Sequence, residues 1–155
     1  MIQEFEHLSQ TERELMFSLP VYVAVLIAGA DGDIDNREVN KANNLANDKL
    51  RNARKDLIAY YAEANESFED KLKMAIANLP SGTAERQKLL VEKLKSANEI
   101  FDKLPKKYAV ALYASLKETA KKIAESSGGV FGYMSIDFEE SKLIELKMIK
   151  DPSRK

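Results

Sequence analysis

Residues 21–30 read VYVAVLIAGA, and this stretch decides the fold class. Nearly every position is apolar, and the strict alternation that is typical of a half-buried strand is absent. A helix that is apolar on all sides is stable only when other helices surround it. The stretch therefore predicts an all-α bundle in which this helix lies at the centre.

The residues before this stretch predict where its helix begins. Ser9-Gln10-Thr11-Glu12 has the spacing of a capping box, in which a serine and a glutamate each satisfy a backbone N–H group at a helix start. Pro20 lies within the helix that this box opens, and a proline there removes one backbone hydrogen bond. We expect Pro20 to break or kink the helix.

The remainder of the chain also has the composition of helices, with glycine and proline between them. Further helices are expected from Asp35, over residues 67–79, 83–103 and 106–125, and from Asp137 through Ile149. A chain of 155 residues is typical of one domain. We therefore expect residues 1–155 to form a single-domain bundle of about seven helices.

Composition and charge exclude several classes of function. The chain has no cysteine and one histidine, His7, so it offers no thiolate metal site and no multi-histidine zinc site, and we expect His7 to be a surface residue. Its net charge of -1 gives no indication of nucleic-acid binding. The longest apolar run is far shorter than the roughly 20 residues that span a bilayer, and no secretory signal is evident. We expect a cytoplasmic protein that does not insert into a membrane.

A pattern that occurs twice indicates internal pseudo-symmetry. The sequence IAGADG at residues 27–32 aligns with IAESSG at residues 123–128. Downstream, IDNRE at residues 34–38 aligns with IDFEE at residues 136–140 after six additional residues. Each copy reads as an apolar helix, a turn, an aspartate cap and a second helix, which predicts two similar helix-turn-helix units.

The first of these turns, ADGDIDNRE at residues 30–38, is unusually acidic. It is not an EF-hand, because the glycine at loop position six and the glutamate at position twelve are missing. Capping explains Asp35 and Glu38, but it does not explain Asp31, at a helix end where the dipole disfavours an anion, or Asp33. A hard cation such as Mg²⁺ or Ca²⁺ would offset the repulsion among these carboxylates, and so would solvent or Arg37.

The two motifs together resemble those of the tellurite-resistance TerB-like family. They are AGADGDIDNRE at residues 28–38 and SSGGVFGYMSIDFEE at residues 126–140. The resemblance implies an all-helical, non-enzymatic bacterial protein of the stress response, with membrane-associated and metal-binding partner proteins. It also implies a metal site on an acidic face formed by the 31–38 and 135–140 turns. The residues it implies are Asp31, Asp33, Glu38, Asp137, Glu139 and Glu140.

Other functions remain as alternatives. The same acidic face could dock a basic partner surface as an interaction module without metal, and a hydrolase using an acid-held metal is a third interpretation. The glycine-rich sequence SSGGVFG lacks the ending of a phosphate-binding loop. Tyr60, Tyr61 and Phe68 could form an exposed aromatic patch for a partner, although packing in the core is the favoured interpretation.

Overall fold

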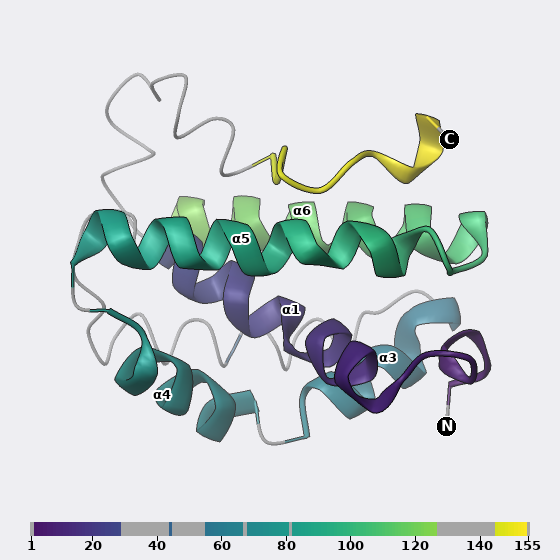
Figure 1. Ribbon diagram of the computed structural model, residues 1–155, viewed down its shortest axis with the longest axis horizontal. Coiled ribbons are helices and arrows are strands. Elements are labelled where there is room, and N and C mark those ends of the chain that lie inside the picture. The colour runs from purple at the N-terminus through teal and green to yellow at the C-terminus, as the bar shows by residue number, and fades with distance from the viewer. Residues whose placement is uncertain are drawn as a thin grey trace.

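The computed structural model describes residues 2–28, 44, 55–66, 68–80, 82–126 and 145–154. These residues form five α-helices and three short 3-10 helices, with no strand among them (Figure 1). The α-helices are α1 (Gln10–Ala28), α3 (Ile58–Ala64), α4 (Phe68–Asn78), α5 (Thr83–Phe101) and α6 (Lys106–Ser126). The 3-10 helices are η1 (Gln3–Phe5), η2 (Lys55–Leu57) and η3 (Pro152–Arg154). The predicted all-α class is confirmed, whereas the predicted total of about seven helices depends on residues outside these ranges.

Helix α1 is the centre of the bundle. It packs against α3, α4, α5 and α6 (Figure 1). Of residues 21–27, all but Tyr22 are buried, and Tyr22 is partly buried against the same core. The prediction that an all-round apolar helix lies in the middle of the bundle is confirmed, because each face of α1 is covered by a different helix.

The predicted capping box opens α1. The Glu12 backbone N–H donates to Ser9 Oγ at 3.1 Å, and the Ser9 backbone N–H donates to Glu12 Oε1 at 2.9 Å. These two bonds satisfy backbone donors that the first helical turn cannot satisfy itself. The helix start that this four-residue pattern predicts is therefore confirmed.

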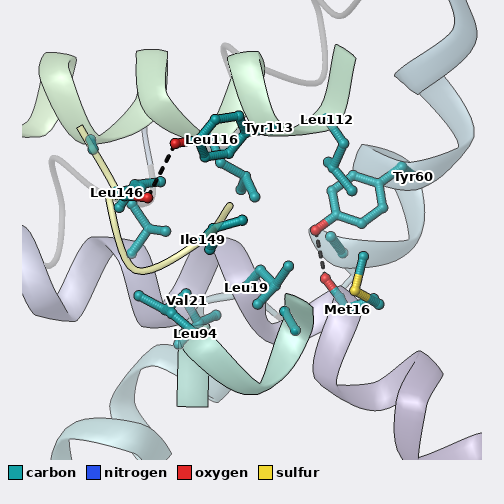
Figure 2. Packing of buried hydrophobic residues seen from close by; sticks show 14 of the residues in the cluster. Met16, Leu19, Val21, Tyr60, Leu94, Leu112, Tyr113, Leu116, Leu146 and Ile149 are labelled. Atoms are coloured by element: carbon teal, nitrogen blue, oxygen red, sulfur yellow. Dashed lines mark hydrogen bonds between the residues drawn. The ribbon is translucent and has the colours of Figure 1, made fainter. Parts of the chain in front are cut away.

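Of the break or kink expected at Pro20, the break is wrong, and the structure provides a reason. Helix α1 continues from Gln10 to Ala28 with Pro20 inside it. Proline has no N–H, so the carbonyl of Met16, four residues earlier, loses its partner in the helix. The Tyr60 hydroxyl of α3 donates to Met16 O at 2.6 Å instead (Figure 2). The helix passes through the proline because a side chain distant in sequence replaces the missing donor.

Helices α4, α5 and α6 begin and end close to the predicted positions. Pro80 and Gly82 lie between α4 and α5, and a short turn that contains Pro105 joins α5 to α6. Helices α5 and α6 pack closely on α1 and only sparsely on each other. A seam therefore lies between α5 and α6.

The C-terminal segment, which we define as residues 145–154, occupies that seam and differs from the prediction. We expected the last helix to continue through Leu146 and Ile149, but residues 145–149 form a turn, and Leu146 has a φ of 50°, in the left-handed region. Hydrogen bonds to Tyr113 and Asn98 take up the backbone groups that a helix would pair internally. The predicted helix is therefore wrong over these residues, and its start at Asp137 lies outside the described ones.

The aromatic residues at the start of α3 and α4 belong to the core. Tyr60, Tyr61 and Phe68 are each at most 4% exposed. Tyr60 packs edge-on against Tyr61 and is stacked with Phe17 of α1, with ring centroids 5.1 and 5.7 Å apart. The core interpretation of these residues is confirmed, and the exposed aromatic patch is wrong.

Candidate functional site

The six acidic residues that the sequence singles out lie outside the described residues. They are Asp31, Asp33, Glu38, Asp137, Glu139 and Glu140. The structure does describe the two helices that lead into the acidic turns. Helix α1 ends three residues before Asp31, and α6 ends eleven residues before Asp137. The relative direction of these two helices therefore bears on whether the turns can meet.

Helices α1 and α6 begin at the same end of the molecule. Glu12, in the first turn of α1, has its Oε2 2.6 Å from Nζ of Lys103 in the turn that precedes α6. The His7 imidazole Nε2 is 2.7 Å from the Lys103 carbonyl oxygen. The rings of Phe5 and Tyr108, which lie close to the two helix starts, have centroids 5.8 Å apart. These contacts join the N-terminal ends of both helices.

Because they start together and pack against each other, α1 and α6 run in the same direction (Figure 1). Their 19 and 21 residues give nearly equal lengths of about 28 and 31 Å at 1.5 Å per residue. Ala28 and Ser126 therefore lie at the same end of the bundle. The negative ends of both helix dipoles point there, which disfavours additional anions unless a positive charge is present.

A pocket of about 260 Å³ lies among α1, α3 and α4. It is lined by Glu14, Phe17, Ser18, Glu63, Glu66 and Lys71. Three carboxylates and one ammonium give it a net negative charge, so it would attract a cationic group more readily than an anion. Within the described part of the chain, no three acidic or histidine side chains gather in a way that could hold a metal ion. The pocket could not be predicted from the sequence, because its residues come from α1, from α3 and the turn after it, and from α4.

Two side chains with a shifted pKa, Glu12 and Tyr60, form contacts between separate segments of the chain. The Lys103 ammonium and the Ser9 N–H lower the pKa of the Glu12 carboxyl from its ordinary value of 4.5 to about 2. Burial raises the pKa of the Tyr60 hydroxyl well above its ordinary value, so this hydroxyl keeps its proton and can donate to Met16. Both pKa shifts belong to structural contacts, and neither places a nucleophile beside a general base.

His7 is exposed, as predicted, and its ring contacts the backbone of the α5–α6 turn. Two residues with clear roles were missed by the sequence analysis. Asn98 of α5 and Tyr113 of α6 hold the C-terminal segment through its backbone. No sequence pattern marks them, because their partners are 32 to 52 residues away.

Comparison of the chain with protein-family models, with curated proteins and with solved structures finds no significant match. Among the described residues, no helix is both long and apolar enough to cross a membrane.

Proposed function

We propose that this chain is a TerB-like, non-enzymatic protein of the bacterial cytoplasmic stress response that binds a divalent cation, Ca²⁺ or Mg²⁺. The acidic face would be formed by the turns at residues 31–38 and 135–140, with two pseudo-symmetric helix-turn-helix units behind it. The cation would offset the repulsion between the turns and fix their relative position. A partner protein would then bind this face.

The parallel packing of α1 and α6 is the observation that carries this proposal. When both turns leave the bundle at the same end, neither connecting segment has to cross the length of the bundle for the carboxylates to share an ion. Ala28 and Ser126 instead lie at one end, where both helix dipoles are negative. Asp31 follows Ala28 by three residues, a distance of at most about 11 Å along the chain. A cation at this end would relieve repulsion from the carboxylates and from the helix ends together.

Thermal melting and calorimetry with single cations test the proposal. We expect about 5 mM Ca²⁺ or Mg²⁺, which exceeds the dissociation constant of weak calcium sites, to raise the melting temperature. The double variant Asp31→Asn, Asp33→Asn should melt at a higher temperature than the parent without metal, because repulsion is removed, and should lose the response to cations. The matched control is Glu92→Gln with Glu99→Gln, which removes two exposed charges from α5 and should leave the cation response unchanged.

A distance measurement tests the geometry directly. The chain has no cysteine, so spin labels can be placed at single sites without a background signal. Labels at Asn36→Cys and Ser135→Cys, beside the acidic residues, should approach each other when the cation is added. Labels at Glu92→Cys and Lys121→Cys, on the exposed faces of α5 and α6, should not move.

The opposite results separate the alternatives. If neither cation changes the melting temperature and the labels at 36 and 135 stay far apart, the shared cation site is wrong. If the labels are close without any cation response, the acidic face is a metal-free interaction module. In that case, binding of a basic partner protein should weaken steeply as salt concentration rises.

A further inference from the structure

The C-terminal segment binds the bundle in the way that a peptide ligand binds a groove. It runs along the seam between α5 and α6 (Figure 1). Leu146 and Ile149 are 0% and 1% exposed, and Figure 2 shows them among Leu116 of α6, Leu94 of α5 and Val21 of α1. The two side chains are three residues apart, while Lys147 between them is exposed. Two apolar anchors therefore enter the core from a segment that has an exposed outer face.

Two side chains of the helices recognise the backbone of the segment. Asn98 Nδ2 donates to Met148 O at 3.0 Å, and the Lys150 N–H donates to Asn98 Oδ1 at 2.8 Å. One carboxamide thus pairs with both a carbonyl and an N–H, as a neighbouring strand would. The Tyr113 hydroxyl lies 3.2 Å from the carbonyl oxygens of both Glu145 and Leu146. Backbone pairing with pockets for alternate side chains is a recurring mode of peptide recognition.

The chain between α6 and this segment does not force the segment onto its own bundle. Residues 127–144 separate Ser126 from Glu145. When extended, such a connection reaches about 65 Å. The path along α6 from Ser126 back to Tyr113 is only about 20 Å. The connection is about three times as long as this path, so its length does not hold the segment in its own seam.

We propose that the seam between α5 and α6 is a peptide-docking site, and that the C-terminal segment of a second copy of this chain occupies it by exchange with the chain's own segment. The second copy fits because it has the same anchors, Leu146 and Ile149, and the same backbone groups for Asn98 and Tyr113. At low protein concentration the chain's own segment has the advantage of its covalent connection, so exchange becomes visible when that segment is disabled. This proposal is independent of the cation site.

Complementation between two full-length variants tests the exchange. The acceptor, Leu146→Asp with Ile149→Asp, has an intact seam but cannot fill it. The donor, Asn98→Ala with Tyr113→Phe, has an intact segment but a weakened seam. We expect each variant to be monomeric alone and the mixture to form a one-to-one complex, measured by sedimentation. Adding Asn98→Ala to the acceptor should weaken this complex about tenfold, because two hydrogen bonds are lost.

The matched control for Asn98 is Lys95→Ala in the acceptor, which removes an exposed side chain one turn away on α5. The control should leave the affinity within about twofold, since Lys95 has no role in the backbone pairing. Absence of a complex between a folded acceptor and the donor at about 100 µM would overturn the proposal. An affinity that does not change on Asn98→Ala would do the same.

A second experiment avoids the aspartate variants, which could fail to fold. A protease site that replaces residues 130–134 of the full chain allows the connection to be cut after folding. A labelled peptide of residues 145–155 should then exchange into the cut protein while the helical circular dichroism signal remains. If the label enters only at denaturant concentrations that also unfold the helices, the segment is an inseparable part of the core and the proposal is wrong.

Discussion

The two ends of the described chain are attached to the same bundle in different ways. At the N-terminal end, Phe5 lies fully buried among the rings of Phe17, Tyr60 and Tyr108. At the C-terminal end, Leu146, Ile149 and Pro152 are buried, and side chains of α5 and α6 form hydrogen bonds to the backbone of the segment. Both ends have side-chain hydrogen bonds to the backbone, since Arg13 donates to the carbonyls of Phe5 and Glu6. The N-terminal end differs in its cluster of aromatic rings, which is specific for the shape of one side chain. We therefore expect the N-terminal attachment to be inseparable from folding and the C-terminal one to be replaceable.

The largest effect is expected at the N-terminal end. Replacing Phe5 with alanine removes a ring from a cluster of three aromatic contacts and leaves a cavity, which should lower the free energy of unfolding by about 3–5 kcal/mol. Urea denaturation followed by circular dichroism measures it. The control Met74→Ala removes a side chain that is 66% exposed and should cost less than about 0.5 kcal/mol. A loss near 1 kcal/mol at Phe5 would remove the difference between the two ends.

A somewhat smaller effect is expected at Leu146. Leu146→Ala should cost about 2–4 kcal/mol, because a fully buried side chain is lost. Glycine variants are usually less stable than alanine variants. Here Leu146→Gly should be no less stable than Leu146→Ala, because the φ of 50° at this residue strains every residue except glycine. Urea denaturation of the two variants gives the comparison. A glycine variant that is clearly less stable than the alanine variant would show that the left-handed turn is absent in solution.

The bond between Tyr60 and Met16 predicts a dependence on Pro20. Tyr60→Phe should cost about 1–3 kcal/mol, because the buried Met16 carbonyl loses its donor. In a Pro20→Ala background the same change should cost clearly less, because the residue at position 20 again supplies an N–H to that carbonyl. A double-mutant cycle in urea measures the difference. Equal costs in both backgrounds would mean that the tyrosine does not replace the proline's missing donor.

Loss of the hydrogen bonds between Asn98 and the backbone of the C-terminal segment should have a moderate effect on stability. Asn98→Ala removes two hydrogen bonds and should cost about 1–2 kcal/mol. Hydrogen exchange should show the loss at Lys150, whose N–H donates to Asn98, while amides within α1 remain protected. If protection is lost throughout the bundle instead, the C-terminal segment is as integral as the N-terminal one.

The smallest effect is expected at the ion pair between Glu12 and Lys103. The pKa of Glu12 is lowered from 4.5 to about 2, so its stabilising contribution is present above pH 4.5 and is lost as the pH falls through about 2. Glu12→Gln should therefore be less stable than the parent near neutral pH, and the difference should disappear near pH 2. Urea midpoints at several pH values measure it. The exposed control Glu92→Gln should show no such convergence.

Features encoded by neighbouring residues were predictable from the sequence. The capping box at Ser9 and Glu12, the central position of residues 21–27 and the ends of α4, α5 and α6 all match the structure. These features depend on hydrophobic periodicity and on proline or glycine at fixed positions, which act within a few residues.

Features that depend on distant partners could not be predicted in this way. Nothing near Pro20 indicates that Tyr60 replaces its missing donor, and nothing near Leu146 indicates that Asn98 and Tyr113 pull the backbone out of a helix. The candidate site depends on both kinds of information. Sequence marked the two acidic turns, and only the packing of α1 on α6 showed that their leading helices end together.

The hydroxyl of Tyr60 has a consequence for the order in which the protein folds. Its partner on Met16 is 44 residues away, so the donor is absent until α3 has docked on α1. Before that step, a helix that spans Pro20 is less stable, because one of the backbone hydrogen bonds between its two sides is missing. We therefore expect a synthetic peptide of residues 10–28 to behave as two short, weakly helical pieces. The continuous helix would form only when α3 docks on α1.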